Sequence, residues 1–194
     1  MGDHLATASP RRAELLEAAY RYVLQHGLSA ASLRPLAAAV GSSTRVLMYL
    51  FGSKDGLVRA LLDRARADEL AALQEVSRGT GGLAAGVEAL WSWLSAEAHR
   101  PLLRLWVECY SRSLTDQDGP WADFARDSVR TWTDVLATCQ SAQERMGPAA
   151  EADRTLALAV LRGALLDLLA TSDVERLTAA VHRCTSSIPR APHS

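Results

Sequence analysis

The sequence has little of what builds disulfide-linked or β-rich proteins. Its 194 residues include three cysteines, Cys109, Cys139 and Cys184, which are widely spaced and odd in number. This argues against a disulfide framework and fits reduced thiols. No two cysteines have the close spacing of a zinc site, so we expect no metal. Aromatic residues make up only 6% of the chain, and Ala and Leu dominate the 48% that are hydrophobic. That composition favours an all-α fold.

Long apolar segments and catalytic motifs are also absent. No apolar run approaches the roughly 20 residues that cross a bilayer. Residues 1–9 lack the basic-then-apolar order of a signal peptide. The sequence contains no G-x-S-x-G, P-loop or H-E-x-x-H motif, and its five histidines suggest no acid–base pair. We therefore expect a soluble, cytoplasmic protein that binds no membrane, needs no cofactor and is not an enzyme.

The most informative pattern lies in residues 32–57. Two short segments have apolar residues at helical spacing: Leu33, Leu36, Ala37 and Val40 in the first, and Val46, Leu47, Leu50 and Phe51 in the second. Ser32 and Ser43 precede these segments, where helix N-caps belong, and Gly41 breaks the pattern between them. Two short helices joined by a tight turn predict a helix-turn-helix, whose second helix can enter a DNA major groove.

The charge distribution agrees with this prediction. Residues 1–60 carry seven basic and four acidic side chains, a net charge of +3, whereas the whole chain has a net charge of −1. A locally basic end on an acidic body favours DNA binding. Without the motif, ordinary variation in surface charge explains the asymmetry equally well.

The same stretch resembles the DNA-binding domain of the TetR (tetracycline-repressor-like) family of transcriptional regulators. The matching residues are Gly41, Ser43, Leu47, Tyr49, Phe51, Ser53, Lys54 and Leu57, and Asp55 stands where the family has Glu. Two positions depart from the family pattern, because Leu50 replaces a frequent histidine and Met48 a frequent aromatic residue. The resemblance covers roughly the first third of the chain.

The outer face of the predicted recognition helix is expected to contact DNA. The candidate DNA-binding residues are Ser32, Arg34, Ser43, Thr44, Arg45, Val46, Met48, Tyr49 and Lys54. Among them Arg45 suits guanine, whose O6 and N7 accept two hydrogen bonds from a guanidinium. Ser32, Tyr49 and Lys54 are assigned to phosphates, and Val46 and Met48 to apolar contact with bases. A purely structural role remains the alternative for each, most of all for Tyr49 and Val46.

Turn signals divide the chain into about nine helices. They cover roughly residues 10–26, 32–40, 44–51, 54–76, 83–98, 102–114, 121–146, 149–171 and 174–187. The resemblance implies a three-helix DNA-binding domain at 1–56 and a helical effector-binding and dimerisation domain at 57–194. In the family, the long helix after the recognition helix links these two parts.

An effector site and a dimer interface are expected in the second domain. Five residues are candidates for contact with a small apolar ligand: Trp91, Trp106, Cys109, Tyr110 and Trp132. Aromatic residues at helical spacing are also typical of plain core, and that alternative stays open. Four leucines form the predicted dimer seam of the penultimate helix: Leu158, Leu161, Leu165 and Leu168. A buried hairpin within one chain is the alternative for this seam.

Together with these patterns, the resemblance implies a homodimeric, sequence-specific transcriptional repressor that a small apolar ligand releases. Its partners are then a palindromic operator in double-stranded DNA, a second copy of the chain and an unknown small-molecule effector. The alternative is a helical ligand-binding or protein-interaction module whose DNA-binding head has degenerated. Leu50, Met48 and the small positive charge motivate that alternative.

Overall fold

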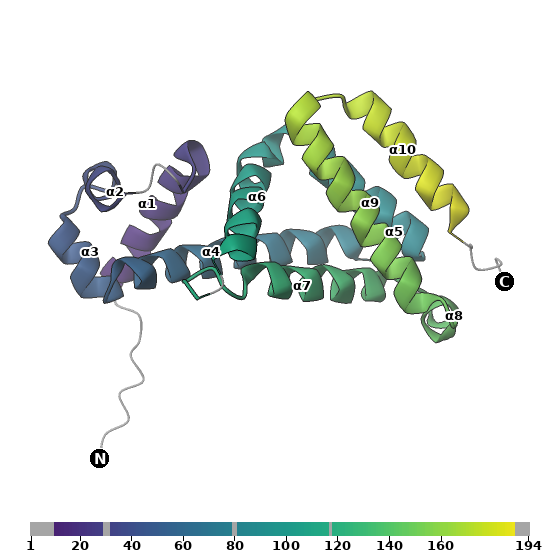
Figure 1. Cartoon of the computed structure of the whole chain (residues 1–194), viewed down its shortest axis with the longest axis horizontal. Coiled ribbons are helices and arrows are strands. Elements are labelled where there is room, and N and C mark those ends of the chain that lie inside the picture. Colours follow the sequence, from purple (N-terminus) through teal and green to yellow (C-terminus); the bar gives the residue numbers. More distant parts are fainter. Residues whose placement is uncertain (1–9, 29–31, 79–80, 117, 189–194) are drawn as a thin grey trace, which may run out of the picture. The chain divides into compact units, whose positions relative to one another are not determined.

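The computed structural model describes residues 10–28, 32–78, 81–116 and 118–188. Within these ranges the chain forms ten α-helices, one short 3-10 helix and no strand, which confirms the all-α prediction (Figure 1). The helices are α1 (Pro10–His26), α2 (Leu33–Ala39), α3 (Thr44–Phe51), α4 (Lys54–Ser77), α5 (Leu83–Ser95), η1 (Glu97–His99), α6 (Arg100–Thr115), α7 (Phe124–Cys139), α8 (Ala142–Met146), α9 (Ala150–Thr171) and α10 (Val174–Ser187).

Internal contacts divide the chain into two compact units. The first contains the chain up to Ala67 together with Arg104–Ala125, and the second contains Asp68–Leu103 together with the chain from Arg126. Helices α4, α6 and α7 contribute residues to both units. The compact units therefore do not follow the functional division predicted at Leu57, which stays a prediction.

In the first unit, α1 supports the short helices α2 and α3. Leu15, Ala19 and Val23 give α1 a buried stripe at helical spacing. On its other side, Glu17 pairs with Arg64 of α4, and the Arg64 guanidinium lies 4.9 Å from the centre of the Tyr20 ring. The ion pair and the ring contact tie α1 to α4.

The C-terminus of α1 is tied to α6. Gly27 ends the helix with φ +77°, a left-handed conformation that glycine adopts without strain. The next backbone amide, that of Leu28, donates to Glu108 Oε2 at 2.9 Å. Glu108 Oε1 accepts from Arg112 Nη2 at 3.3 Å. One carboxylate of α6 thus holds both the end of α1 and a neighbouring guanidinium.

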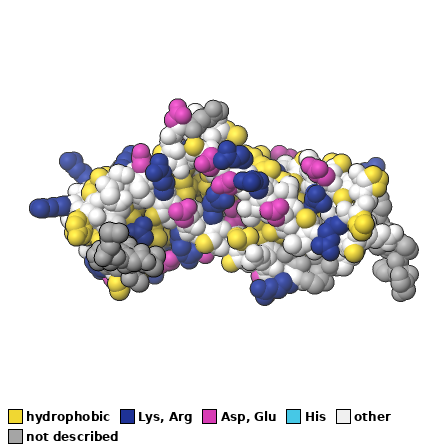
Figure 2. Space-filling view, turned by 90° about the horizontal axis from the view of Figure 1, so that it is seen from below, with side chains coloured by type: hydrophobic (Ala, Val, Ile, Leu, Met, Phe, Trp, Pro, Cys, Tyr) yellow, Lys and Arg dark blue, Asp and Glu magenta, His cyan; other side chains and the backbone are white. Residues whose placement is uncertain are grey.

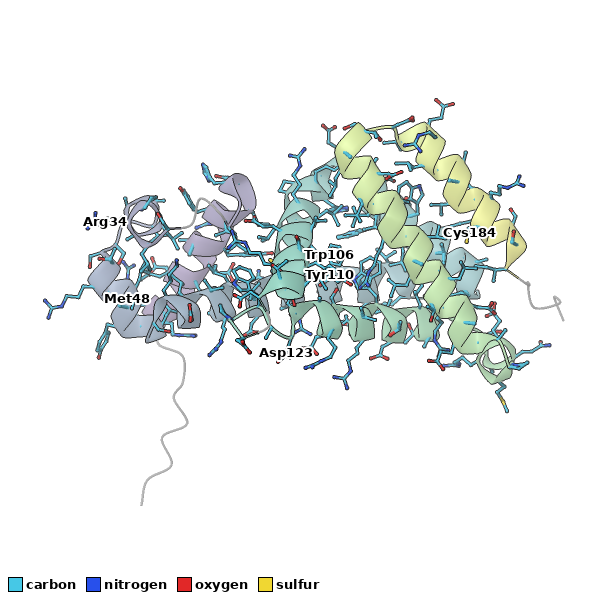
Figure 3. All side chains as sticks on the ribbon, viewed as in Figure 1. Arg34, Met48, Trp106, Tyr110, Asp123 and Cys184 are labelled. Atoms are coloured by element: carbon cyan, nitrogen blue, oxygen red, sulfur yellow. The ribbon has the colours of Figure 1, made fainter. Side chains whose placement is uncertain are left out.

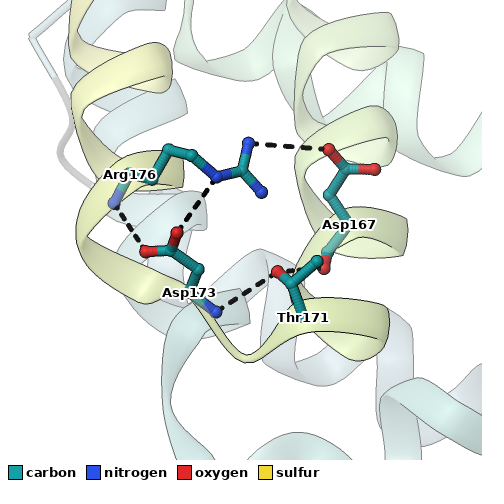
Figure 4. Close-up of polar contacts among 4 residues, drawn as sticks. All are labelled: Asp167, Thr171, Asp173 and Arg176. Atoms are coloured by element: carbon teal, nitrogen blue, oxygen red, sulfur yellow. Dashed lines mark hydrogen bonds and ion pairs between the residues drawn. The ribbon is translucent and has the colours of Figure 1, made fainter.

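In the second unit, α5, α9 and α10 pack against one another, with α9 and α10 running in opposite directions (Figure 1). Asp173 caps α10 through the amide of Arg176 at 3.1 Å, and its other oxygen accepts from Arg176 Nε at 3.1 Å (Figure 4). Arg176 also lies 3.9 Å from Asp167 of α9. These side chains are about half exposed, so each pair contributes little energy but together they fix the turn.

Several helix boundaries in the middle of the chain differ from the sequence prediction, and the predicted helix 83–98 ends at Ser95, before η1. The predicted helix 121–146 is wrong as a single element, because Ser141 and Glu144 form a capping box that starts the separate helix α8. Gln140, buried at the break, donates to Ala150 O at 3.1 Å and accepts from Arg154 at 2.7 Å. Helix α6 also begins at Arg100 rather than Leu102, since Pro101 falls in the first turn, where a missing N–H costs little.

Candidate nucleic-acid interface

A tight turn sets the angle between α2 and α3. Gly41 has φ +62°, and a Cβ built on it would meet nothing within 4 Å. The backbone conformation, rather than a lack of space, therefore requires glycine here. Ser42 N donates to Ala37 O at 2.9 Å and closes the turn. The predicted helix-turn-helix is thus formed by α2, this turn and α3.

Helix α3 has one buried face and one exposed face. Ser43 caps its N-terminus by accepting from the Val46 amide at 3.2 Å. Leu47 and Phe51 point into the core, with exposed fractions of 1% and 7%. Tyr49 is 86% exposed, which is unusual for a large aromatic side chain and argues against the structural alternative for this residue.

The remaining candidates on α3 also lie where DNA can reach them. Arg45 and Val46 are exposed, whereas Thr44 and Met48 are half-buried. Figure 3 shows Met48 on α3 and Arg34, which is exposed, on α2. The predicted base-reading residues therefore share the accessible side of one helix.

Two helix N-termini flank this surface. Ser32 stands at the N-cap of α2 but makes no side-chain capping hydrogen bond, so its hydroxyl remains available for a phosphate. Lys54 is the first residue of α4 and is exposed. Ser53 caps that helix by accepting from the Gly56 amide at 2.9 Å. Helix N-termini favour anions because their first amides are unpaired and the helix dipole is positive there.

Arg12 is a supporting residue whose role the sequence did not reveal. Its Nε donates to Leu50 O near the C-terminus of α3 at 3.3 Å, and its guanidinium lies 4.8 Å from the centre of the Phe51 ring. A basic residue on the first helix, 38 positions from its partner, gives no sequence signal for such a contact.

The positive charge of this region is local. On the face drawn in Figure 2, Lys and Arg side chains are interspersed with Asp and Glu. The chain as a whole has a net charge of −1. Attraction to a polyanion must then come from the few cations near α2, α3 and α4 rather than from the field of the whole molecule.

A family model for "Bacterial regulatory proteins, tetR family" matches residues 15–61. The chain belongs to this family of DNA-binding transcriptional regulators. All nine predicted DNA-binding residues lie inside the matched range. Membership confirms the family resemblance and the expectation of a regulator that is not an enzyme.

Individual relatives agree with the assignment. The chain is 30% identical over 111 residues to the HTH-type transcriptional regulator BetI of Burkholderia thailandensis, a match that spans 54% of this chain and only 55% of that relative. A crystal structure of a transcriptional regulator from Rhodococcus sp. Rha1 has 26% identity and a TM-score of 0.74, covering 91% of this chain and 95% of that one. The multidrug binding protein EbrR, solved with imidazole, has 23% identity and a TM-score of 0.67, covering 95% and 93%.

The predicted ligand-binding residues are divided between the two compact units. Trp106 and Tyr110, neighbours on α6 in Figure 3, form a tilted ring pair with centroids 4.9 Å apart, and Cys109 beside them is fully buried. Trp91 and Trp132 belong to the other compact unit, where Trp91 Nε1 donates to Thr178 at 2.9 Å. All but Tyr110 are buried, as the core alternative also predicts.

A buried carboxylate accompanies one of these tryptophans. Glu69 of α4 is 6% exposed and accepts from Trp132 Nε1 at 2.6 Å. In the sequence Glu69 resembles any charged residue of a long helix, so no local pattern singles it out. Among the thiols, burial raises the pKa of Cys184, which keeps this thiol protonated at neutral pH.

The leucines of the predicted dimer seam are buried within the single chain, as the hairpin alternative also predicts. Leu158, Leu161, Leu165 and Leu168 have exposed fractions of 5%, 0%, 1% and 0% within a single chain, because this face of α9 packs on α5 and α10. Their part in a dimer stays a prediction. The opposite face of α9 instead carries an exposed row of apolar and small residues, which we call the α9 outer stripe: Leu156, Ala159, Gly163, Leu166 and Ala170.

Two further properties concern the described residues only. Among them, no three His, Cys, Asp or Glu side chains come close enough together to hold a metal ion. None of the helices in those ranges combines the length and apolar character of a membrane span.

Proposed function

We propose that this regulator is a homodimeric repressor that reads a palindromic operator with α3 and is released by a small apolar ligand. The observation that carries the proposal is the division of α3 into a buried face and a face with Arg45 and the 86% exposed Tyr49. Exposure of a large aromatic residue beside a guanidinium suits a phosphate backbone and base edges. Binding to chromosomal DNA would also place the protein in the cytoplasm.

Each DNA-binding residue has a role that follows from its chemistry. Arg45 is proposed to pair with guanine, and Val46 and Met48 to touch apolar base atoms such as the thymine methyl group. Ser32, Tyr49 and Lys54 are proposed to bind phosphates, while Arg34 reaches either backbone or base. The hydroxyl of Ser43 caps α3, so this residue acts mainly by holding the N-terminus of α3 in place.

Dimerisation is proposed to use the α9 outer stripe. Its members follow one another at alternating spacings of three and four residues, the repeat that lines the contact between two paired helices. Leu156 and Leu166 are 54% and 50% exposed in the single chain. Around Gly163 there is open space, which allows a partner helix to approach closely. A two-fold dimer would also match the symmetry of a palindromic operator.

The effector is proposed to bind among the helices after Leu57. In support of this proposal, the multidrug binding protein EbrR shares the fold and was solved with imidazole bound. In this chain the same part contains the aromatic residues of α5, α6 and α7, which suit an apolar ligand. Because α4 begins next to α3 and continues to Ser77, a shift of α4 would carry a ligand signal to the DNA-binding helix.

Selection from random double-stranded DNA tests the proposal. The full-length protein should enrich a site with two-fold symmetry and half-sites separated by about one helical turn, roughly 34–36 Å. If the selection enriches no symmetric sequence, the protein does not bind a palindromic operator and the proposal is wrong. Dimerisation with no DNA affinity even at low salt would favour the alternative, a ligand-binding module with a degenerate head.

A further inference from the structure

A cavity of about 330 Å³ lies within the first compact unit. Its wall comes from α2, the first two turns of α4, the end of α6 and the loop before α7. We propose that it binds a small apolar carboxylate through Arg112, at a site separate from the aromatic candidates of the effector domain. The volume lies at the lower end of the range for small-molecule sites, about 300–1,000 Å³.

The floor of the cavity is apolar. Leu36, Leu57, Leu61 and Trp121 line it with exposed fractions of 1%, 3%, 3% and 6%. None of these side chains offers a charge, so the apolar part of a ligand would lie against them and leave water. The indole of Trp121 presents a flat surface that suits an aromatic or branched ligand.

Arg112 supplies a positive group that is already positioned. Its guanidinium lies 5.2 Å from the centre of the Trp121 ring and 3.3 Å from Glu108 Oε1, and its side chain remains 42% exposed. A guanidinium presents five N–H donors in a planar fork that matches both oxygens of a carboxylate. Stacking on the indole keeps this fork from rotating freely, which lowers the entropy lost on binding.

The acidic residues of the wall compete less for a ligand. Asp116 Oδ1 accepts from the Gly119 amide at 3.0 Å, and a Cβ on Gly119 would approach both carboxylate oxygens within 2.8 Å. The Asp116 carboxylate therefore contacts the backbone of its own loop. Asp55 lies in the first turn of α4, where the helix dipole stabilises a carboxylate. Lys54, also on the wall, adds a second cation.

The cavity shares residues with the proposed DNA contacts. Ser32 and Lys54 line it and are also assigned to phosphates. A carboxylate bound to Arg112 would compete with Glu108, which holds the Leu28 amide at the end of α1. Ligand binding should therefore weaken operator binding. This last step rests on the proposed DNA binding, whereas the site itself does not.

Benzoate is a suitable probe, tested on the full-length protein without DNA. The sequence has five tryptophans, so labelling their indoles with ¹⁵N gives five side-chain signals, and Trp121→Phe identifies the one from the cavity. Benzoate should shift that signal with a dissociation constant in the millimolar range, as expected for so small a ligand. Neutral benzamide should bind about tenfold more weakly because it cannot pair with the guanidinium.

Matched variants assign the binding to this cavity. Arg112→Gln should weaken benzoate binding about tenfold, whereas Arg104→Gln, an exposed position two turns earlier on α6, should leave it unchanged. Val58→Phe fills the cavity without removing a charge and should also weaken binding. Far-ultraviolet circular dichroism verifies that each variant folds.

Three results would overturn the proposal: no shift of the Trp121 signal, equal binding of benzamide, or tighter binding of benzylamine, which would indicate a cation site. The link to DNA is tested separately by operator affinity with and without benzoate. If the protein binds no DNA but Trp121 responds as described, the ligand site stands and the proposed repressor function fails. If operator binding is normal and the Trp121 signal does not move, the proposed repressor function stands and the ligand site fails.

Discussion

Helices α3 and α9 each have a buried face and an exposed face, but their exposed faces differ in chemistry. The outer side of α3, a helix of eight residues, carries Arg45 and Tyr49. The α9 outer stripe has no charged residue and includes Gly163, around which there is open space. The first surface offers hydrogen bonds and charge, whereas the second offers close apolar contact.

This difference indicates two kinds of partner. A polyanion is attracted by cations and by donors at helix N-termini, and it requires little apolar burial. A second copy of the chain must instead bury enough apolar area to offset the entropy lost on association. Substitutions on both faces of α9, on the outer face of α3 and at the helix N-termini should separate these two kinds of partner.

The inner face of α9 should dominate stability. Leu161→Ala removes a fully buried side chain and should lower the free energy of unfolding by about 2–5 kcal/mol, because the cavity left behind refills only in part. Leu114→Ala, at a 59% exposed leucine of α6, should change it by less than about 0.5 kcal/mol. Urea unfolding at one protein concentration measures both. If both variants lose the same free energy of unfolding, the inner face of α9 does not contribute more to stability than an exposed position.

The α9 outer stripe should decide the oligomeric state. Leu166→Glu places a carboxylate in the proposed apolar interface, where an unpaired charge is costly to bury. We expect the dissociation constant of the dimer to rise about 100-fold, which corresponds to about 2.7 kcal/mol. Sedimentation velocity gives the masses. Val129→Glu makes the same change at a 36% exposed valine of α7 and should leave the dimer intact. A Leu166→Glu protein that remains dimeric would place the interface elsewhere.

These two faces of α9 show where sequence reasoning succeeds and where it stops. Periodicity identified an apolar seam on this helix, and the predicted boundaries 149–171 agree closely with α9 (Ala150–Thr171). It could not decide which apolar row faces the chain's own core. That choice depends on how α5 and α10 pack against α9, and α5 lies far away in the sequence.

The helix-turn-helix was more predictable because its sequence signals are local. The cap at Ser43, the turn at Gly41 and the buried Leu47 all follow from residues a few positions apart. Arg12, Glu108 and Glu69 act through partners 38, 80 and 63 positions away, so no local pattern reveals them. The capping box at Ser141 is local, but the apolar spacing on either side of it concealed the break.

On the outer face of α3, Arg45 should determine base preference. Arg45→Ala removes the proposed bidentate contact to guanine and should cost about 1–3 kcal/mol of discrimination at one position of each half-site. Fluorescence anisotropy with operators changed at single base pairs measures this loss. Arg21→Ala removes an exposed guanidinium from α1 and should leave the preferences unchanged. If Arg45→Ala weakens all operators equally, the residue binds phosphate instead.

The two N-cap serines should separate folding from DNA binding. Ser43→Ala loses a capping hydrogen bond and should lower the free energy of unfolding by about 1 kcal/mol. Ser32 makes no such bond, so Ser32→Ala should change stability by only a few tenths of a kcal/mol while weakening DNA binding. Urea unfolding and anisotropy on both variants provide the comparison. A reversed order of stabilities would mean that α2, not α3, depends on its cap.

Lys54 should give the smallest effect, and one without sequence preference. It is the only lysine of the chain and the first residue of α4. Lys54→Ala should weaken binding to all DNA sequences by a similar factor and lower the slope of log K against log salt by about 1, because one fewer counterion is released. Lys54→Arg retains the charge and should keep the slope. An unchanged slope for Lys54→Ala would remove this residue from the phosphate contacts and leave its place on the cavity wall as its remaining proposed role.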